Sequence, residues 1–119
     1  MTNTKYKSLL LVLFIGMINA QNTYVPDDNF EQGLIDLGYD DVLDDYVLTE
    51  NINGVLSLTF NDKSIVDMTG IEAFTSLTQL NLSDNNIQSL DLSSNTALEQ
   101  IHVNGNQLTS LDVTSNVNL

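Results

Sequence analysis

The chain of 119 residues contains no cysteine and no tryptophan, and it carries one histidine and three basic residues, all of them lysines. The absence of cysteine excludes the disulfide framework that usually supports small extracellular domains. It also excludes metal centres built from cysteine and histidine clusters. The single histidine, His102, is not accompanied by a nucleophile-elbow or phosphate-loop motif, which argues against an enzyme within these residues. Because disulfides are excluded, the fold must be stabilised in another way.

Two of the three lysines lie in the first residues. Lys5 and Lys7 precede an apolar run that ends near Ile18, and small Ala20 follows. This layout is typical of a secretory signal peptide over residues 1–20 with cleavage near Ala20, and the run is short for a membrane span. An uncleaved N-terminal anchor is the alternative. We predict a secreted or cell-surface protein with no membrane insertion after cleavage.

Cleavage would leave all 16 acidic residues against Lys63 alone. Such a surface repels phosphate backbones and anionic lipids, so nucleic acid and membrane surfaces are not expected as partners. Cations and basic partners are favoured instead.

The C-terminal half repeats itself. Leu77–Ala97 aligns with Leu98–Asn118 without a gap, residues 55–76 form an atypical earlier copy, and Leu119 opens another. Each clean copy holds the pattern apolar-x-x-apolar-x-apolar-x-x-Asn twice. Alternating apolar residues predict short strands with one face inward, and stacked copies can bury that face together. We predict two half-turns per copy, strands on both sides, and backbone-capping asparagines at the turns: Asn85, Asn95, Asn106 and Asn116.

The segments LTQLNLSDNNIQSL (77–90) and LEQIHVNGNQLTSL (98–111) resemble the leucine-rich repeat family. The copy VLSLTFNDKSIVDM (55–68) is weaker, because Lys63 stands in the place of the asparagine. Residues 55–80 are similar to internalin-type repeats, and the whole mature chain is similar to secreted surface repeat proteins of Bacteroidetes-like bacteria. The resemblance implies an α/β solenoid, mostly β, in which a right-handed coil of short parallel strands follows an N-terminal helical cap.

Residues 21–54 are expected to form that cap, ahead of repeats at 55–76, 77–97 and 98–118. A helix is predicted over about 28–37, beginning with a capping-box-like pair, Asp28 and Glu31, and ending at Gly38. Phe30, Leu34 and Leu37 would share its buried face. A strand over 47–52 is expected to pair with the first repeat. Within that repeat, a turn at 69–70 and a short helical piece at 71–74 are predicted.

The last residues remain apolar, with Val113, Val117 and Leu119 leading into a new repeat. An open apolar edge on a repeat stack invites association. We hypothesise that the chain is the N-terminal part of a longer protein. The alternative is edge-to-edge self-association.

The resemblance implies that the strand face binds a protein or glycan partner of unknown identity. The outward positions on that face are Thr59, Asn61, Gln79, Asn81, Ser83, Gln100, His102 and Asn104. They could equally be ordinary solvated residues. The predicted function is a secreted or cell-surface recognition module. The alternative is a structural cap and spacer of a larger surface protein whose activity lies elsewhere, and an enzyme could exist only in residues outside this sequence.

No catalytic residue, cofactor or established metal site is predicted. Asp91 and Asp112 occupy the same position in successive copies and should stack, which suggests either a divalent cation or hydroxyl capping by Ser89 and Ser110. Hydroxyl capping is favoured, because calcium requires about 6–8 oxygen ligands. A denser acidic cluster lacks the EF-hand pattern and is expected to be a solvated loop, with calcium as the weaker alternative: Asp40, Asp41, Asp44 and Asp45.

Overall fold

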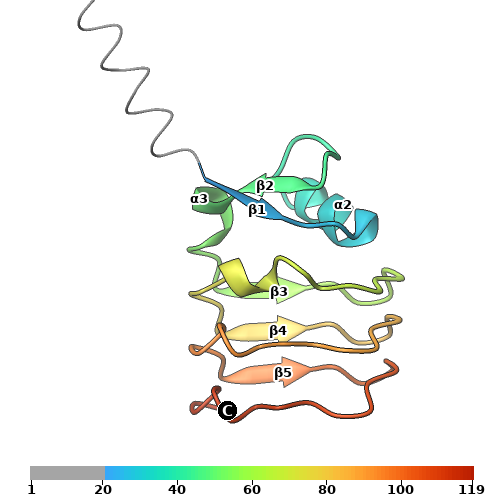
Figure 1. The fold of residues 1–119 in the computed structure, drawn as a ribbon, viewed down its shortest axis with the longest axis vertical. Coiled ribbons are helices and arrows are strands. Elements are labelled where there is room, and N and C mark those ends of the chain that lie inside the picture. Colours follow the sequence, from blue (N-terminus) through green and yellow to red (C-terminus); the bar gives the residue numbers. More distant parts are fainter. Residues whose placement is uncertain (1–20) are drawn as a thin grey trace, which may run out of the picture.

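The computed structural model describes residues 21–119, and the predicted signal peptide lies outside this range. A cap of four short elements stands on three stacked coils, each of which carries one strand (Figure 1). The cap elements are β1 (Asn22–Tyr24), α2 (Asp28–Asp36), β2 (Tyr46–Leu48) and α3 (Thr49–Ile52). The coils contain β3 (Ser57–Thr59), the 3₁₀ helix η1 (Ile71–Ala73), β4 (Gln79–Asn81) and β5 (Gln100–His102).

The strands β3, β4 and β5 form one parallel sheet in the order of the sequence. Leu58, Leu80 and Ile101 occupy equivalent positions in the register, and Leu58 and Leu80 are fully buried. Because side chains alternate across a strand, their neighbours point away from the core. The predicted solenoid of short parallel strands is therefore confirmed.

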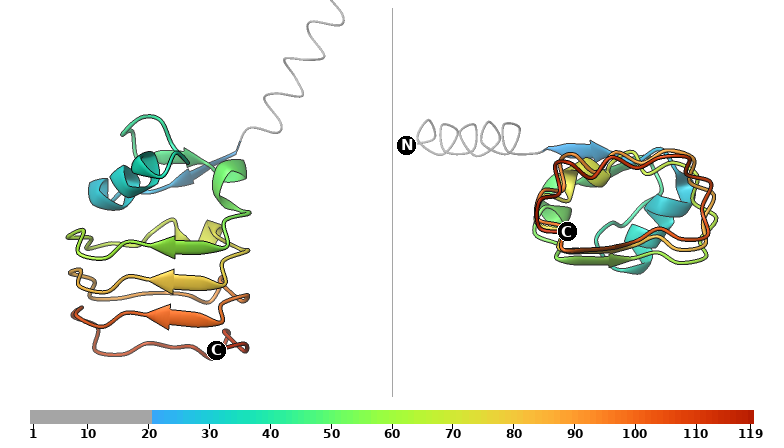
Figure 2. Two further views of the ribbon diagram at one scale, coloured as in Figure 1. Left: turned by 180° about the vertical axis from the view of Figure 1, so that it is seen from behind. Right: turned by 90° about the horizontal axis from the view of Figure 1, so that it is seen from below.

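The wall opposite the sheet does not contain the predicted second set of strands. Within residues 55–119, η1 occupies this wall in the first coil, and irregular extended segments occupy it in the next two (Figure 2). The carboxylate of Asp91 accepts a hydrogen bond from the backbone N–H of Ser93, and Asp112 accepts one from Thr114.

The asparagines lie at both turns of the coils, as predicted, and each one bonds to backbone groups of the preceding coil. The amide nitrogen of Asn85 donates to the carbonyls of Phe60 and Leu82, and its oxygen accepts from the N–H groups of Lys63 and Ile65. Asn106 repeats this role one coil later. At the other turn, Asn95 and Asn116 also donate to carbonyls of the coil before them.

Helix α2 begins at Asp28, but its N-cap is Asp27, whose carboxylate accepts from the N–H groups of Asn29 and Phe30. The expected capping box of Asp28 and Glu31 is therefore wrong. Glu31 is buried and turns toward the following loop, where it accepts from the backbone N–H groups of residues 44 and 45. Phe30 and Leu34 are buried as expected, but the expectation that Leu37 shares the buried face is wrong, since Leu37 lies at the C-cap and is exposed.

The expected strand over 47–52 is also wrong. Residues 46–48 form β2, which pairs antiparallel with β1, and residues 49–52 form helix α3. The turn before η1 agrees with the prediction, since Gly70 has a positive φ of 108° and the 3₁₀ helix follows at once.

A single core runs from the cap into the coils. Phe30 of α2 lies with its ring centre 5.8 Å from that of Phe60 and 6.2 Å from that of Phe74. The apolar packing of the cap therefore continues into the first coil and, through Leu77 and Ile87, into the second. No helix in residues 21–119 has the length and apolar character that a membrane crossing requires.

Candidate functional site

The outer face of the parallel sheet gathers polar side chains from all three coils. Thr59, Gln79, Gln100 and His102 are exposed, and the register places Gln79 beside Gln100. Together with their neighbours they line a shallow hollow of about 160 Å³. The buried residues between them hold the strands in place, so these polar side chains stand on a rigid support.

The structure places the remaining predicted face residues less uniformly. Asn61 and Asn104 are exposed just beyond the strand ends, and Asn81 is half-buried. Ser83 is buried, and its hydroxyl lies 2.7 Å from the side-chain oxygen of Asn81 and 2.9 Å from that of Asn104. The prediction that Ser83 presents a free surface is therefore wrong, because its hydroxyl serves the turn.

Sequence reasoning missed one member of this hollow. Ser57 is exposed and lies in register with Gln79 at the start of the sheet. The alternation back from Thr59 was the signal that could have found it. The face offers neutral hydrogen-bond donors and acceptors, an arrangement suited to recognition.

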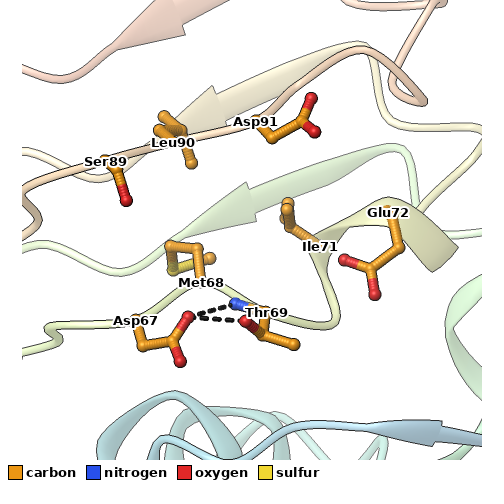
Figure 3. A pocket seen from close by; sticks show the side chains of 8 residues that line it. All are labelled: Asp67, Met68, Thr69, Ile71, Glu72, Ser89, Leu90 and Asp91. Atoms are coloured by element: carbon orange, nitrogen blue, oxygen red, sulfur yellow. Dashed lines mark hydrogen bonds between the residues drawn. The ribbon is translucent and has the colours of Figure 1, made fainter.

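A second hollow, of about 250 Å³, lies on the opposite wall (Figure 3). It is lined by the side chains of Asp67, Thr69, Glu72 and Asp91, with apolar Met68, Ile71 and Leu90 between them. Asp67 accepts hydrogen bonds from both the N–H and the hydroxyl of Thr69, at 2.8 and 2.7 Å. Asp67 and Glu72 escaped sequence analysis because they belong to the atypical copy.

The stacked aspartates are held by hydroxyl residues that differ from those expected. Asp112 accepts from the hydroxyl and N–H of Thr114, and these hydrogen bonds lower the pKa of Asp112. Ser93 likewise lowers the pKa of Asp91, against a smaller opposing effect from Asp112. The capping residues therefore follow each aspartate by two positions, and Ser89 and Ser110 do not supply the cap.

The acidic loop does not bring its four aspartates together. Asp45 is the one that joins a carboxylate group, and its partners are Asp28 and Glu31, with ligand atoms all within 4.8 Å. The two Glu31 oxygens already accept hydrogen bonds from the loop, at 2.9 and 3.0 Å. This geometry fastens the loop to the helix, and Asp40, Asp41 and Asp44 lie outside the group.

Comparisons with known proteins agree with this architecture. A family model described as Leucine Rich repeats (2 copies) matches residues 75–116. Internalin J of Listeria monocytogenes is 40% identical over 80 residues, which cover 67% of this chain and 9% of that protein. The chain therefore spans less than a tenth of the length of this relative.

Solved structures give the same result. The functional domain of internalin J from Listeria monocytogenes, described as including a cysteine ladder, matches with a TM-score of 0.73 and 38% identity, over 85% of this chain and 23% of that one. An internalin (inlF) from the same species matches with a TM-score of 0.74 and 24% identity, over 81% and 29% of the two chains. Internalin C2 from the same species matches with a TM-score of 0.74 and 22% identity, over 84% of this chain and 47% of that one. The last two show the fold alone.

Proposed function

The chain is a leucine-rich repeat protein of the internalin-like kind, and we propose that it is a recognition module that binds a protein partner through the outer face of the sheet β3–β4–β5. The observation that carries this proposal is the register of the three strands, which aligns two polar rows over one hollow: Ser57, Gln79 and Gln100 in one, and Thr59, Asn81 and His102 in the other. A glycan is the second ligand class that such neutral polar groups fit. Binding, and not catalysis, is the proposed activity.

The rigidity of the support favours this function. Leu58 and Leu80 anchor their strands in the core, and Asn85 clamps the turn that follows. A partner would therefore bind polar groups that are already positioned, which lowers the entropic cost of association.

The proposal can be tested with a triple variant, Gln79→Ala, Gln100→Ala and His102→Ala. These side chains are exposed, so the fold should survive their removal. Immobilised wild type and variant would be compared for the proteins and glycans that each retains from an extracellular extract. Loss of a specific partner in the variant is expected.

A matched triple variant controls for surface changes in general. Gln88→Ala, Gln107→Ala and Thr109→Ala alter exposed residues of the same coils away from the sheet face. This control should retain the partner. Equal retention by both variants would contradict strand-face recognition and favour the structural alternative, a cap and spacer. Three side-chain hydrogen bonds that fasten the cap to the first coil favour that second function.

The proposal extends to location and to length. The N-terminal pattern of Lys5, Lys7 and the apolar run supports export to the cell surface or medium. Exposed apolar side chains on the last coil support a continuing stack, since Val117 is 80% exposed and Leu119 is 46% exposed. We propose that further coils cover them in a longer protein, and that self-association would cover them otherwise.

An added coil tests the proposed continuation. Appending a second copy of residues 99–118 after Leu119, which already stands in the place of Leu98, should raise the midpoint of denaturant unfolding, because the apolar edge of the present last coil becomes buried. Sedimentation of the unextended chain supplies the control. A stable monomer that unfolds sharply, with no gain from the added coil, would contradict both continuation and self-association.

A further inference from the structure

The outer face of the small sheet β1–β2 is apolar and uncovered within the described chain. Tyr24, Tyr46 and Leu48 are 48%, 48% and 41% exposed, while Thr23 and Val47 between them point into the core. Tyr24 and Tyr46 are paired across the strands with their ring centres 5.5 Å apart. This cross-strand contact supports the sheet, yet about half of each ring remains open to a partner.

The strand β1 lies over the wall opposite the sheet β3–β4–β5, as the end-on view in Figure 2 shows. Gly70 fixes its position. A Cβ atom at Gly70 would lie 2.8 Å from Val25 and 2.9 Å from the carbonyl oxygen of Tyr24, so β1 rests directly on the turn before η1. The residues on either side of Gly70 line the acidic hollow. The strand that carries Tyr24 therefore borders the turn that forms one edge of the hollow.

In each of the three carboxylates of the hollow, one oxygen accepts a hydrogen bond from the chain itself, and this bond orients the side chain. One oxygen of Asp67 accepts from Thr69, one of Glu72 accepts from the N–H of Gly70, and one of Asp91 accepts from Ser93. Within residues 21–119 no hydrogen bond reaches the other oxygen of any of the three. Lys63 is the single basic residue in this range, and it lies at a turn, bonded through its backbone to Asn85.

We propose that the outer face of β1–β2, together with the hollow beside it, docks a cationic protein segment that carries arginine or lysine side chains among apolar residues. An arginine guanidinium fits over the exposed tyrosine rings, where it is attracted by their π faces. A basic side chain of the same segment can also donate to the free carboxylate oxygens of the hollow. Leu48 extends the apolar contact. This surface is separate from the strand face and does not depend on it.

Charge decides between the possible occupants. A second copy would bring its own excess of acidic residues against this acidic surface, which opposes association. A neutral glycan could stack on the tyrosines but would leave the three carboxylates unmatched. A basic segment satisfies both the rings and the carboxylates.

The test uses a short peptide of alternating arginine and valine, titrated into the isotope-labelled chain and followed by NMR. A peptide with glutamate in place of each arginine is the matched control. Amide shifts confined to residues 22–24, 46–48, 67–72 and 89–91 are expected with the arginine peptide and not with the glutamate peptide. Shifts spread evenly over the acidic surface would overturn the proposal.

Two variants separate a specific site from diffuse charge. Tyr24→Leu with Tyr46→Leu keeps the sheet face apolar but removes the π systems, and it should weaken binding of the arginine peptide by about five- to tenfold. Asp67→Asn with Asp91→Asn keeps the hydrogen-bond acceptors but removes two charges, and it should weaken binding similarly. Asp41→Asn with Glu99→Gln removes two exposed charges elsewhere and should leave binding nearly unchanged.

Other outcomes point to other occupants. An equal effect of the distant charge variant would show that net charge alone attracts the peptide, and the proposal would fail. If the chain forms concentration-dependent dimers and the Tyr24→Leu with Tyr46→Leu variant does not, this face is a self-interface. If a neutral oligosaccharide binds more strongly than the arginine peptide, the face is a glycan site. The Gln79→Ala, Gln100→Ala and His102→Ala variant should bind the peptide as wild type does, which keeps this test distinct from that of the strand face.

Discussion

The carboxylate of Asp27 accepts a hydrogen bond at 2.9 Å from the backbone N–H of Val66, 39 residues further along the chain. The same oxygen accepts from the N–H of Asp67 at 3.0 Å, while the other oxygen caps α2 through Asn29 and Phe30. One side chain therefore both starts the cap helix and fastens the cap to the first coil.

Replacing Asp27 with alanine should lower the free energy of unfolding by about 2–3 kcal/mol, because it removes a helix cap and leaves two further N–H groups without their partner. Urea denaturation followed by circular dichroism measures this. Asp28→Ala is the control, since Asp28 is exposed and lies near the carboxylates of Glu31 and Asp45. It should change stability by no more than about 0.5 kcal/mol, and equal losses in both variants would contradict the fastening role.

Replacing Asn85 with alanine should be more damaging, with a loss of about 3 kcal/mol or more, because several buried backbone groups lose their hydrogen bonds together. The neighbouring Asn86 is exposed and uses only its backbone N–H, so Asn86→Ala should have little effect. Denaturant midpoints of the two variants, measured side by side, would decide. A small loss in Asn85→Ala would mean that water replaces the amide at this turn.

These asparagines also show how far the sequence led. Their spacing placed them at the turns, and the alternation of Leu80 with Leu82 predicted the inward face of β4, because both signals repeat in every clean copy. The antiparallel pairing of β1 with β2 could not be predicted in this way. Those strands have three residues each and lie far apart in sequence, so no local pattern marks their partner.

The opposite wall was mispredicted for a different reason. Its apolar spacing resembles that of the strand wall, and its outward aspartates accept from the N–H two positions later, so neither feature distinguishes the two walls in the sequence. Asn81 and Ser83 make the same contact where β4 ends. Most residues of the candidate strand face were identified from the alternation of apolar and polar residues. Ser83 was assigned to that face wrongly, because its spacing in the sequence is the same whether its side chain faces solvent or bonds within the turn.

Replacing Gly33 with alanine should destabilise the cap despite the better helix propensity of alanine. The added Cβ would lie 2.8 Å from the ring of Phe60, which is buried against Phe30. Overpacking costs about 1–3 kcal/mol, and the propensity gain offsets about 1 kcal/mol of it. Thermal unfolding measures the balance. Gly54→Ala, where the added atom meets open space, should be neutral or slightly stabilising, and a stabilised Gly33→Ala would show that Phe60 yields easily.

Replacing Thr114 with valine should raise the pKa of Asp112 toward the ordinary value of about 3.9, because the hydroxyl donor is lost while the backbone donor remains. The folded pKa of Asp112 lies below its unfolded value, so its contribution to stability is present above about pH 4 and is lost as the pH falls through the folded pKa. Carboxyl NMR titration measures the shift. Thr109→Val, on the same wall, should leave the titration of Asp112 unchanged, and an unaltered pKa in Thr114→Val would show that the backbone bond alone holds it.

The stacking of asparagines gives the solenoid a direction. Asn85 bonds to backbone groups of the first coil and Asn106 to those of the second, so in each case the asparagine side chain belongs to the coil that comes later. Asn95 and Asn116 follow the same rule at the other turn. Backbone groups at the turns of a coil therefore have these hydrogen-bond partners only when the next coil is in place. Loss of one asparagine should destabilise the coil nearer the cap. Each coil therefore stabilises its neighbour on the N-terminal side.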